Sequence, residues 1–395
     1  MKKGWQIKAL GDVADVSAGN SAPQDESLFK DGTYPFFRTS DAGRVRFGDI
    51  YKSTDYLNEK GIKGLRRYPK GTILFPKSGA STFLNHRVML GVEGCVSSHL
   101  ATIVADEKQA HPRFLLYFLS TIAAQDLVQD HAYPSLNLPT ISAINIQVPP
   151  LPEQQWIVGI LDEAFEGIAT AKANTEKNLQ NARALFESHL QSVFAQRGKG
   201  WKQKTLEEIA TTFGRGKSKH RPRNAPNLYG GKYPFVQTGD VRNADHFITE
   251  YSQTYSNAGL AQSKLWPKGT ICITIAANIA ETAILGFDAC FPDSVIGVVA
   301  NPKEAEVGFI EYLLQSFKAR IQAMGKGSAQ ANINMGTFEH ERFPFPPVSE
   351  QKQIVTTLDD LREETKRLAR LYERKLAALD GMKKSLLHQA FAGEL

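Results

Sequence analysis

Two short segments of this sequence carry side chains that can form hydrogen bonds with the edges of nucleic-acid bases. Their polar residues are Arg38, Thr39, Ser40, Arg44 and Arg46 in the first segment and Gln237, Thr238 and Arg242 in the second. An arginine can donate two hydrogen bonds to a guanine, and a glutamine can pair in the same bidentate way with an adenine. We therefore predict base contacts from both segments, above all from Arg38 and Gln237. The alternative is that the segments only form turns, a role that we favour for Asp41 and Asp240 because both segments share the aspartate.

A basic stretch in the second half of the chain is suited to binding phosphate groups. Its basic residues, within 215–223, are Arg215, Lys217, Lys219, His220, Arg221 and Arg223. Glycine and proline interrupt the stretch, which predicts a loop. Clustered cations of this kind bind the nucleic-acid backbone, and a merely solvated loop is the alternative. The counterpart in the first half, residues 18–29, lacks this charge, so we expect the two halves to bind nucleic acid unequally.

Three further polar loops are weaker candidates for contacts with nucleic acid. The first contains Lys77, Ser78 and Arg87, the second surrounds Asn278, and the third contains Lys326. Each combines cationic or hydrogen-bonding side chains with small residues, as expected of a loop that approaches a phosphate backbone. We add Lys77, Ser78, Arg87 and Lys326 to the predicted contact residues.

Residue patterns that carry catalysis are missing from the sequence. Residues 216–218, Gly-Lys-Ser, match the end of a phosphate-binding loop, but Thr211 stands where the first glycine of that motif belongs. The sequence contains no His-Glu-x-x-His motif and no cysteine and histidine cluster with the spacing of metal ligands. We therefore predict a chain that has no catalytic residues and no metal site.

The composition is that of a globular protein with a mild positive charge. The 395 residues include 47 Lys and Arg against 41 Asp and Glu, which gives a net charge of +6. Residues 1–197 carry 21 basic and 20 acidic residues, whereas residues 198–395 carry 26 and 21, so the excess lies in the second half. No apolar run is long enough to cross a membrane and no secretory signal is visible, so we expect no membrane association. The three cysteines show no C-x-x-C spacing, which favours a reducing cytoplasm.

The elements that must position these segments occur twice along the chain. Blocks at 34–41, 69–73, 114–117 and 149–154 recur in the same order at 233–240, 267–271, 309–312 and 346–351, at offsets of 195–199 residues. A period this long exceeds that of any solenoid repeat, so it indicates the tandem duplication of a domain. Residues 196–200 form a basic linker between the two copies.

Each copy begins with an irregular α/β domain and ends with a long helix. Short β-like runs occur at 71–75, 100–104, 270–275 and 295–299, and helical spacing occurs at 112–127 and 307–324. Residues 153–195 and 350–392 contain no proline, and their apolar residues, which include Met382, recur at a near-heptad spacing. We therefore predict an α+β fold with two duplicated α/β domains, at 1–150 and 198–347. The helices, at 151–197 and 348–395, would each be roughly 65 Å long and pair as an antiparallel coiled coil.

This arrangement resembles the specificity subunit of type I restriction–modification enzymes. The resemblance is carried by the blocks at 34–41, 233–240, 69–72, 267–270, 149–154 and 346–351 and by the C-terminal helix end at 386–395. It implies that each α/β domain is a target recognition domain for one half of a bipartite double-stranded DNA sequence, and that the helices are a spacer that sets the gap. It also implies docking of two modification (methyltransferase) subunits and of restriction (motor and nuclease) subunits. Those partners would bind S-adenosylmethionine, ATP and Mg, and this chain would bind no cofactor.

Two other hypotheses belong to different functional classes. The chain could be a non-catalytic scaffold whose coiled coil organises partner proteins without DNA sequence specificity. It could also be part of a single-chain enzyme with its own methyltransferase and nuclease, but such an enzyme would need several hundred more residues.

Overall fold

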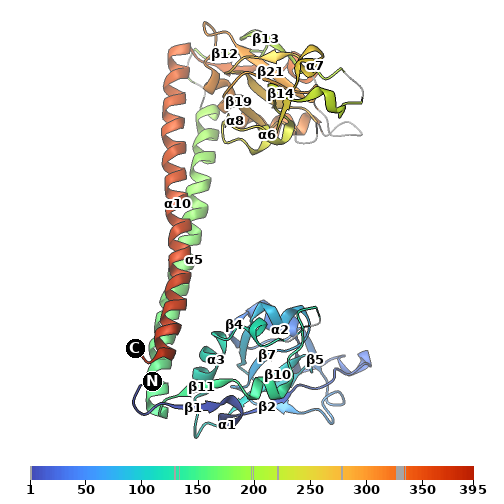
Figure 1. Ribbon diagram of the computed structural model, residues 1–395. Helices are drawn as coiled ribbons and strands as arrows, with labels where there is room; N and C mark the ends of the chain where they lie inside the picture. Colours follow the sequence, from blue (N-terminus) through green and yellow to red (C-terminus); the bar gives the residue numbers. More distant parts are fainter. Residues whose placement is uncertain are drawn as a thin grey trace. The chain divides into compact units, whose positions relative to one another are not determined.

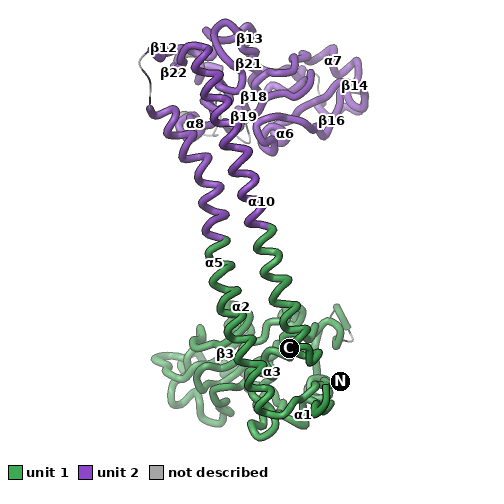
Figure 2. The backbone as a smooth tube through the Cα atoms, turned by 90° about the vertical axis from the view of Figure 1, so that its left-hand side faces the viewer, with its two compact units in different colours: residues 1–175, 374–395 green, residues 176–373 purple. Residues whose placement is uncertain are grey.

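The computed structural model describes residues 2–128, 130–132, 134–196, 198, 200–219, 222–276, 279–325, 333 and 335–395. By its internal contacts the chain forms two compact units (Figure 2). The first unit comprises Met1–Thr175 and Arg374–Leu395, and the second comprises Glu176–Glu373. Both long helices therefore contribute one part to each unit.

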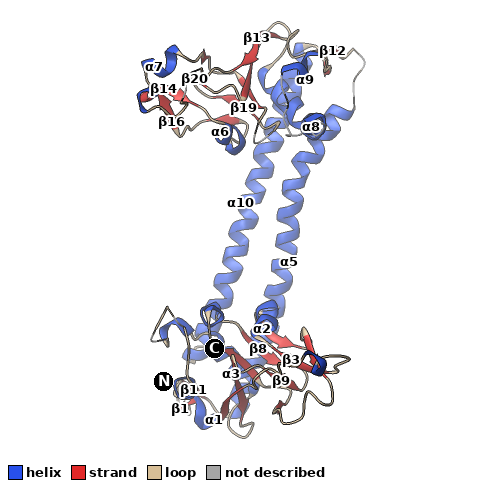
Figure 3. Cartoon of the chain, turned by 90° about the vertical axis from the view of Figure 1, so that its right-hand side faces the viewer, coloured by secondary structure: helices blue, strands red, loops and turns tan. Residues whose placement is uncertain are grey.

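The first unit contains a five-stranded sheet, a four-stranded sheet and a two-stranded ribbon (Figures 1 and 3). The five-stranded sheet has the order β2 (Ala14–Ala18), β10 (Leu100–Ala105), β7 (Ile73–Pro76), β8 (Arg87–Leu90) and β4 (Phe47–Ile50). The four-stranded sheet has the order β5 (Asp55–Leu57), β3 (Tyr34–Phe37), β9 (Gly94–Val96) and β6 (Arg67–Tyr68). The ribbon pairs β1 (Gln6–Ala9) with β11 (Asn145–Val148).

Short helices connect and cover these strands. The α-helices are α1 (Leu10–Val13), α2 (Thr39–Val45), α3 (Pro112–Ser120) and α4 (Leu138–Ser142), and the 3₁₀ helices are η1 (Glu26–Leu28), η2 (Ala80–Leu84) and η3 (Ala124–Asp126). Strand β7 is buried over its whole length, and its residues Ile73 and Phe75 belong to the same apolar core as Phe114 and Leu115 of α3. This burial explains why the strand is a continuous apolar run rather than an alternating one.

The second unit repeats this strand order. Its five-stranded sheet runs β13 (Ala210–Arg215), β21 (Val295–Ala300), β18 (Ile271–Thr274), β19 (Thr282–Leu285) and β15 (Phe247–Ile248). Its four-stranded sheet runs β16 (Gln253–Tyr255), β14 (Tyr229–Phe235), β20 (Ala289–Cys290) and β17 (Leu265–Trp266), and its ribbon pairs β12 (Lys202–Lys204) with β22 (Phe343–Phe345). The helices are η4 (Pro226–Leu228), α6 (Thr238–Asn243), α7 (Asn257–Ala261), α8 (Val307–Gly325) and α9 (Met335–Glu339). The predicted duplication of an α/β fold is therefore confirmed.

The two long helices, α5 (Leu151–Ala195) and α10 (Val348–Ala392), pack against each other in opposite directions. In the first unit, Lys172 forms an ion pair with Asp380 at 2.7 Å. In the second unit, Arg183 forms an ion pair with Glu373 at 2.8 Å. Residue numbers rise along α5 as they fall along α10, so the predicted antiparallel pairing is confirmed.

Two details of the predicted helices are wrong. The helix expected over 112–127 ends at Ser120, because the hydroxyl groups of Ser120 and Thr121 donate to the carbonyl groups of Tyr117 and Phe118 and compete with the next helical turn. Met382 was expected in the contact stripe of α10 but is 54% exposed. An α-helix turns every 3.6 residues and drifts away from a strict heptad, which brings the neighbouring Lys383 inward instead.

Candidate functional site

The two predicted base-contacting segments have the same local structure. In each unit a strand, β3 or β14, is followed almost at once by a short helix, α2 or α6. The backbone N–H groups of Arg38 and Gln237, which precede these helices, donate to the carboxylates of Asp41 and Asp240, in both cases at 2.7 Å. An acidic side chain in the first turn of a helix satisfies an N–H group that has no partner within the helix. The turn-capping role that we favoured for both aspartates is therefore confirmed.

Asp41 is more deeply embedded than its counterpart. It is only 1% exposed, and its second oxygen accepts hydrogen bonds from the N–H and the hydroxyl of Thr54 at 3.0 and 2.7 Å. Arg44 forms an ion pair with the same oxygen and donates to the Thr54 hydroxyl. The guanidinium of Arg44 is thus engaged within its own domain, although its side chain is 60% exposed.

The side chains of Arg38 and Gln237 each bond to the neighbouring strand of the small sheet. Arg38 Nε forms a hydrogen-bonded ion pair with the carboxylate of Asp55 on β5, and the Arg38 guanidinium also lies 5.2 Å from the centre of the Phe36 ring. Gln237 Nε2 donates to Gln253 Oε1 on β16 at 2.6 Å. Both Arg38 and Gln237 remain partly exposed.

The remaining predicted residues of these segments lie on or directly beside α2 and α6. Thr39 and Thr238 are half-buried, whereas Ser40, Arg46 and Arg242 are exposed. Arg46 has a φ of 68°, a left-handed conformation that is uncommon for residues other than glycine. In the loop after β7, Lys77 and Ser78 are half-buried.

Arg87 was wrongly predicted as a contact residue. It is the first residue of β8, its side chain is fully buried, and its guanidinium lies 3.4 Å from the centre of the Phe75 ring. It donates to the carbonyl groups of His86 and Ile122 at 2.8 and 3.4 Å, and burial lowers its pKa to about 9. A buried guanidinium of this kind cannot reach a phosphate, so Arg87 is a core residue of the first domain.

The basic stretch begins at the last residue of β13, and its described residues after Arg215 lie outside helices and strands. Asp293 anchors it at two points: its carbonyl oxygen accepts from Arg215 Nε at 2.6 Å, and its carboxylate pairs with Arg223 at 2.8 Å. Lys217 and Lys219 are exposed. The predicted residues Arg221 and Lys326, and the flanking candidates His220 and Asn278, lie outside the described residues.

Lys264 adds to this basic loop and was missed by the sequence analysis. Its ammonium group lies 3.6 Å from the centre of the Trp266 ring. The hydroxyl of the adjacent Ser263 donates to the carbonyl of Lys217 at 2.8 Å, so this segment contacts the basic loop. Burial, followed by the charge of Lys217, lowers the pKa of Lys264. The only sequence signal was a lysine two residues before a tryptophan in a β-like run.

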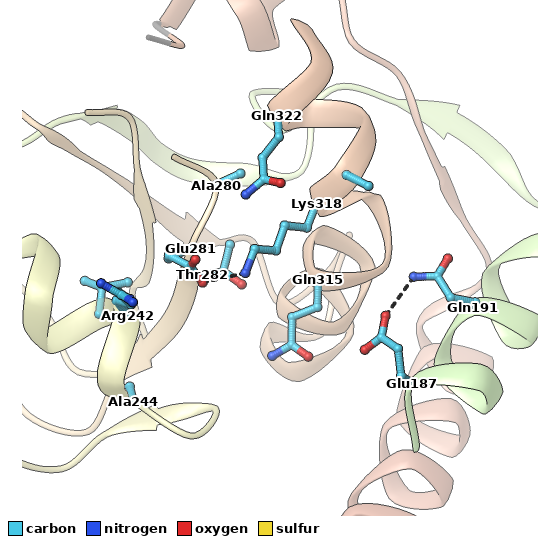
Figure 4. Close-up of a pocket in the computed structure, with 12 residues that line it drawn as sticks. Glu187, Gln191, Arg242, Ala244, Ala280, Glu281, Thr282, Gln315, Lys318 and Gln322 are labelled. Atoms are coloured by element: carbon cyan, nitrogen blue, oxygen red, sulfur yellow. Dashed lines mark hydrogen bonds and ion pairs between the residues drawn. The ribbon is translucent and has the colours of Figure 1, made fainter. Parts of the chain in front are cut away.

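A pocket of about 340 Å³ in the second unit lies beside Arg242 (Figure 4). Lys318 of α8 reaches into it and forms an ion pair with Glu281 at 2.7 Å, and Gln191 donates to Glu187 on another wall at 3.2 Å. The pocket is lined by residues of α5, α6 and α8 and by the turn that leads into β19, and most of its lining side chains are polar.

A buried histidine–glutamate pair lies deeper in the same unit and was also missed. His246 Nδ1 lies 2.6 Å from Glu311 Oε2, and the two side chains are 5% and 0% exposed. Glu311 also accepts from the Thr282 hydroxyl at 3.0 Å, and the His246 ring stacks on Tyr312. His246 has a φ of 77°, whereas the corresponding position of the first domain is Gly48, with a φ of 97°. The strained backbone of His246 is therefore maintained by the bonds of its side chain.

Within the described part of the chain, no group of His, Cys, Asp and Glu side chains is arranged to hold a metal ion. Among the helices of that part, none combines the length and the apolar composition that a membrane span requires. The three cysteines, Cys95, Cys272 and Cys290, are buried and free.

Comparisons with known proteins agree with this architecture. Residues 2–181 and 198–373 each match the family model described as the type I restriction modification DNA specificity domain. The specificity subunit of the type I restriction enzyme EcoKI from Escherichia coli K12 is 21% identical over 433 residues, which cover 100% of this chain and 90% of that protein.

Two solved structures have the same fold over the whole chain. The first comes from work on complex assembly and conformational transition of the type I restriction–modification system; it has a TM-score of 0.80 and 20% identity and covers 100% of this chain and 99% of that one. The second is the HsdS subunit from Thermoanaerobacter tengcongensis, with a TM-score of 0.68, 19% identity and coverage of 100% and 98%.

Proposed function

Because the chain belongs to the type I restriction–modification DNA specificity family, we propose that it is the DNA-recognition subunit of such a complex. Each α/β domain, at 1–150 and 198–347, binds one half of a bipartite target. The helices α5 and α10 form a spacer that sets the gap between the two halves.

The observation that carries this proposal is that the family match occurs twice, once over each copy of the duplicated fold. Both copies present partly exposed polar side chains at the same strand-to-helix turn, but the side chains differ. Two similar domains with different hydrogen-bonding groups are suited to two different half-sites, because bases are distinguished by the pattern of donors and acceptors.

The proposed DNA contacts are the predicted residues other than Arg87. They are Arg38, Thr39, Ser40, Arg44, Arg46, Lys77 and Ser78 in the first domain and Arg215, Lys217, Lys219, Arg221, Arg223, Gln237, Thr238, Arg242 and Lys326 in the second. The arginines and lysines of the basic loop bind phosphates, so the affinity of the second domain depends more steeply on salt concentration.

We also propose that the chain is not itself an enzyme and acts in the cytoplasm through partner proteins. It docks two modification subunits and the restriction subunits, and those partners bind S-adenosylmethionine, ATP and Mg. The match of both copies to a DNA specificity domain supports this proposal.

A DNA protection assay on the complex of this chain with its modification subunits tests the proposal. Protection of a bipartite sequence is the expected result. Binding without sequence preference would favour a scaffold instead, and methyl transfer by the purified chain alone would show that it is an enzyme.

A further inference from the structure

Two side-chain pairs occupy equivalent places in the duplicated domains but differ in chemistry. In the first domain, Phe36 of β3 faces Asp55 of β5, and Arg38 bonds to Asp55. In the second domain, Phe235 of β14 faces Gln253, and Gln237 bonds to Gln253. In each pair, one residue lies two positions after the phenylalanine (Phe36 or Phe235), and the other is the residue that faces that phenylalanine across the sheet. The first domain has an ion pair there, and the second has a neutral amide pair.

The backbone that carries the two pairs is the same. Arg38 has φ and ψ of −111° and 170°, and Gln237 has −102° and 169°. The N–H group of each donates to the capping aspartate at 2.7 Å. The two side chains therefore leave equivalent turns in the same direction, and the difference between them lies in their functional groups.

In each pair, one polar atom of Arg38 or Gln237 bonds to the partner residue, and the remaining polar atoms of that side chain can bond to a base. Arg38 uses Nε for Asp55, and its guanidinium lies 5.2 and 5.9 Å from the ring centres of Phe36 and Phe29. In the part of the chain that the structure describes, its two Nη groups make no hydrogen bond, so they present a forked pair of donors. Guanine offers the matching pair of acceptors, O6 and N7, in the major groove.

Gln237 presents a different edge. One N–H of its amide is bonded to Gln253, which leaves the second N–H as a donor and Oε1 as an acceptor. A donor beside an acceptor matches adenine, whose N7 accepts and whose N6 donates. Gln253 thus selects the orientation in which the amide of Gln237 faces outward.

We infer that the Arg38–Asp55 pair specifies a guanine in one half-site and that the Gln237–Gln253 pair specifies an adenine in the other. This inference rests on the proposed function. Arg38 and Gln237 contact the base, and Asp55 and Gln253 are positioning residues that fix each side chain before DNA binds. Asp55 also offsets the charge of Arg38, which reduces the attraction of Arg38 to phosphates at any DNA sequence. Hydrogen bonds to the guanine are then the main contribution of Arg38 to the binding free energy.

Exchanging the pairs between the domains tests this inference. The double variant Arg38→Gln/Asp55→Gln is prepared as the full chain in complex with its modification subunits, and so is the reciprocal variant Gln237→Arg/Gln253→Asp. The target of each complex is determined by selection from random DNA. In the first variant one guanine of one half-site should become adenine, and in the reciprocal variant one adenine of the other half-site should become guanine. The gap and all other positions should stay the same.

The matched control changes another ion pair of the same small sheet. Arg67 on β6 pairs with Glu93 at 3.0 Å, and both side chains are about half exposed. The variant Arg67→Gln/Glu93→Gln makes the same chemical change and should leave the target unaltered. If the exchanged variants fold poorly, Asp55→Asn and Gln253→Ala serve instead. Each should reduce discrimination at its own position by about tenfold, within the range of a bidentate contact, without changing other positions.

The possible failures are distinguishable. An unchanged target in the exchanged variants, or an equal loss of affinity for all sequences in the single variants, would overturn the inference and leave the proposed function intact. A wild-type complex with no sequence preference would overturn the proposed function itself.

Discussion

The side-chain oxygen of Gln154 accepts a hydrogen bond from the backbone N–H of His111 at 2.8 Å, which ties the first turn of α5 to the start of α3. Gln154 is completely buried, and its amide nitrogen donates to the carbonyl groups of Gln109 and Pro149 at 2.9 and 2.8 Å. Gln351 does the same in the second copy, where it accepts from the N–H of Glu306 at 2.8 Å. The glutamine of each repeated Pro-Pro-x-x-Glu-Gln sequence therefore joins the start of a long helix to its own domain.

Replacing Gln154 by leucine should lower the free energy of unfolding by about 2–3 kcal/mol, because one buried N–H and two buried carbonyl groups lose their partner. Urea unfolding of the chain measures the change. Gln155→Leu is the matched control, since Gln155 is exposed and its loss should change stability by less than about 0.5 kcal/mol. Equal effects of the two substitutions would show that the buried amide does not stabilise the junction.

The two capping aspartates should differ in their contribution to stability. Asp41→Ala removes three accepted hydrogen bonds and an ion pair from a buried site, so we expect a loss of about 3 kcal/mol. Asp240→Ala removes the cap on Gln237 from a half-buried site, so we expect about 1 kcal/mol. Thermal unfolding of both variants gives the comparison, and a larger effect at Asp240 would contradict it.

The buried His246–Glu311 pair should be costly to break but inexpensive to replace. Glu311→Leu leaves His246 without its partner and should destabilise the chain by about 3 kcal/mol. The first copy has Leu116 in the position of Glu311. The double variant His246→Gly/Glu311→Leu reproduces the Gly48–Leu116 combination of the first copy and places glycine at the positive φ of 77°. It should therefore recover part of the loss, because a buried polar pair is then replaced rather than broken. A double variant no more stable than the single one, in the same urea unfolding assay, would contradict this account.

Lys383 should make stability depend on pH in the alkaline range. Its ammonium group lies 4.2 and 4.7 Å from the ring centres of Phe47 and Phe165, and burial lowers its pKa below the ordinary 10.5. The unfolded chain then retains this proton to a higher pH than the folded chain does. Between the pKa of Lys383 in the folded chain and 10.5, the unfolded chain binds more protons than the folded chain. The free energy of unfolding therefore increases with pH over this range.

The comparison of wild type with Lys383→Met isolates this contribution. The variant should be the more stable of the two at neutral pH, and its advantage should shrink as the pH approaches 10.5. Lys384→Met, at an exposed neighbouring position, should show no such trend. A difference between wild type and Lys383→Met that stays constant with pH would contradict the assignment.

The repeat made the duplicated domains and the two long helices predictable, because the same sequence blocks recur in both copies. Within each domain only the longest β-like runs and one helix could be identified in this way. The contacts that connect distant residues were not predictable in the same way. Arg38 was recognised as a candidate, but Asp55 was not, since β5 is three residues long and its pairing with β3 leaves no periodic pattern. The polar residues before Arg87 suggested that it belongs to a loop. Arg87 is instead the first residue of β8, and its side chain points into the domain. The His246–Glu311 pair spans 65 residues of sequence, and only the mismatch with Gly48 and Leu116 in the other copy could have revealed it.

The central claim is that one chain recognises two different half-sites at a fixed separation. Sequencing the methylated bases of cells that express this chain with its modification subunit tests that claim most directly. The account predicts methylation at one bipartite, asymmetric sequence with a constant gap. Methylation at a single uninterrupted sequence, or methylation that depends on the modification subunit alone and is unchanged without this chain, would contradict it.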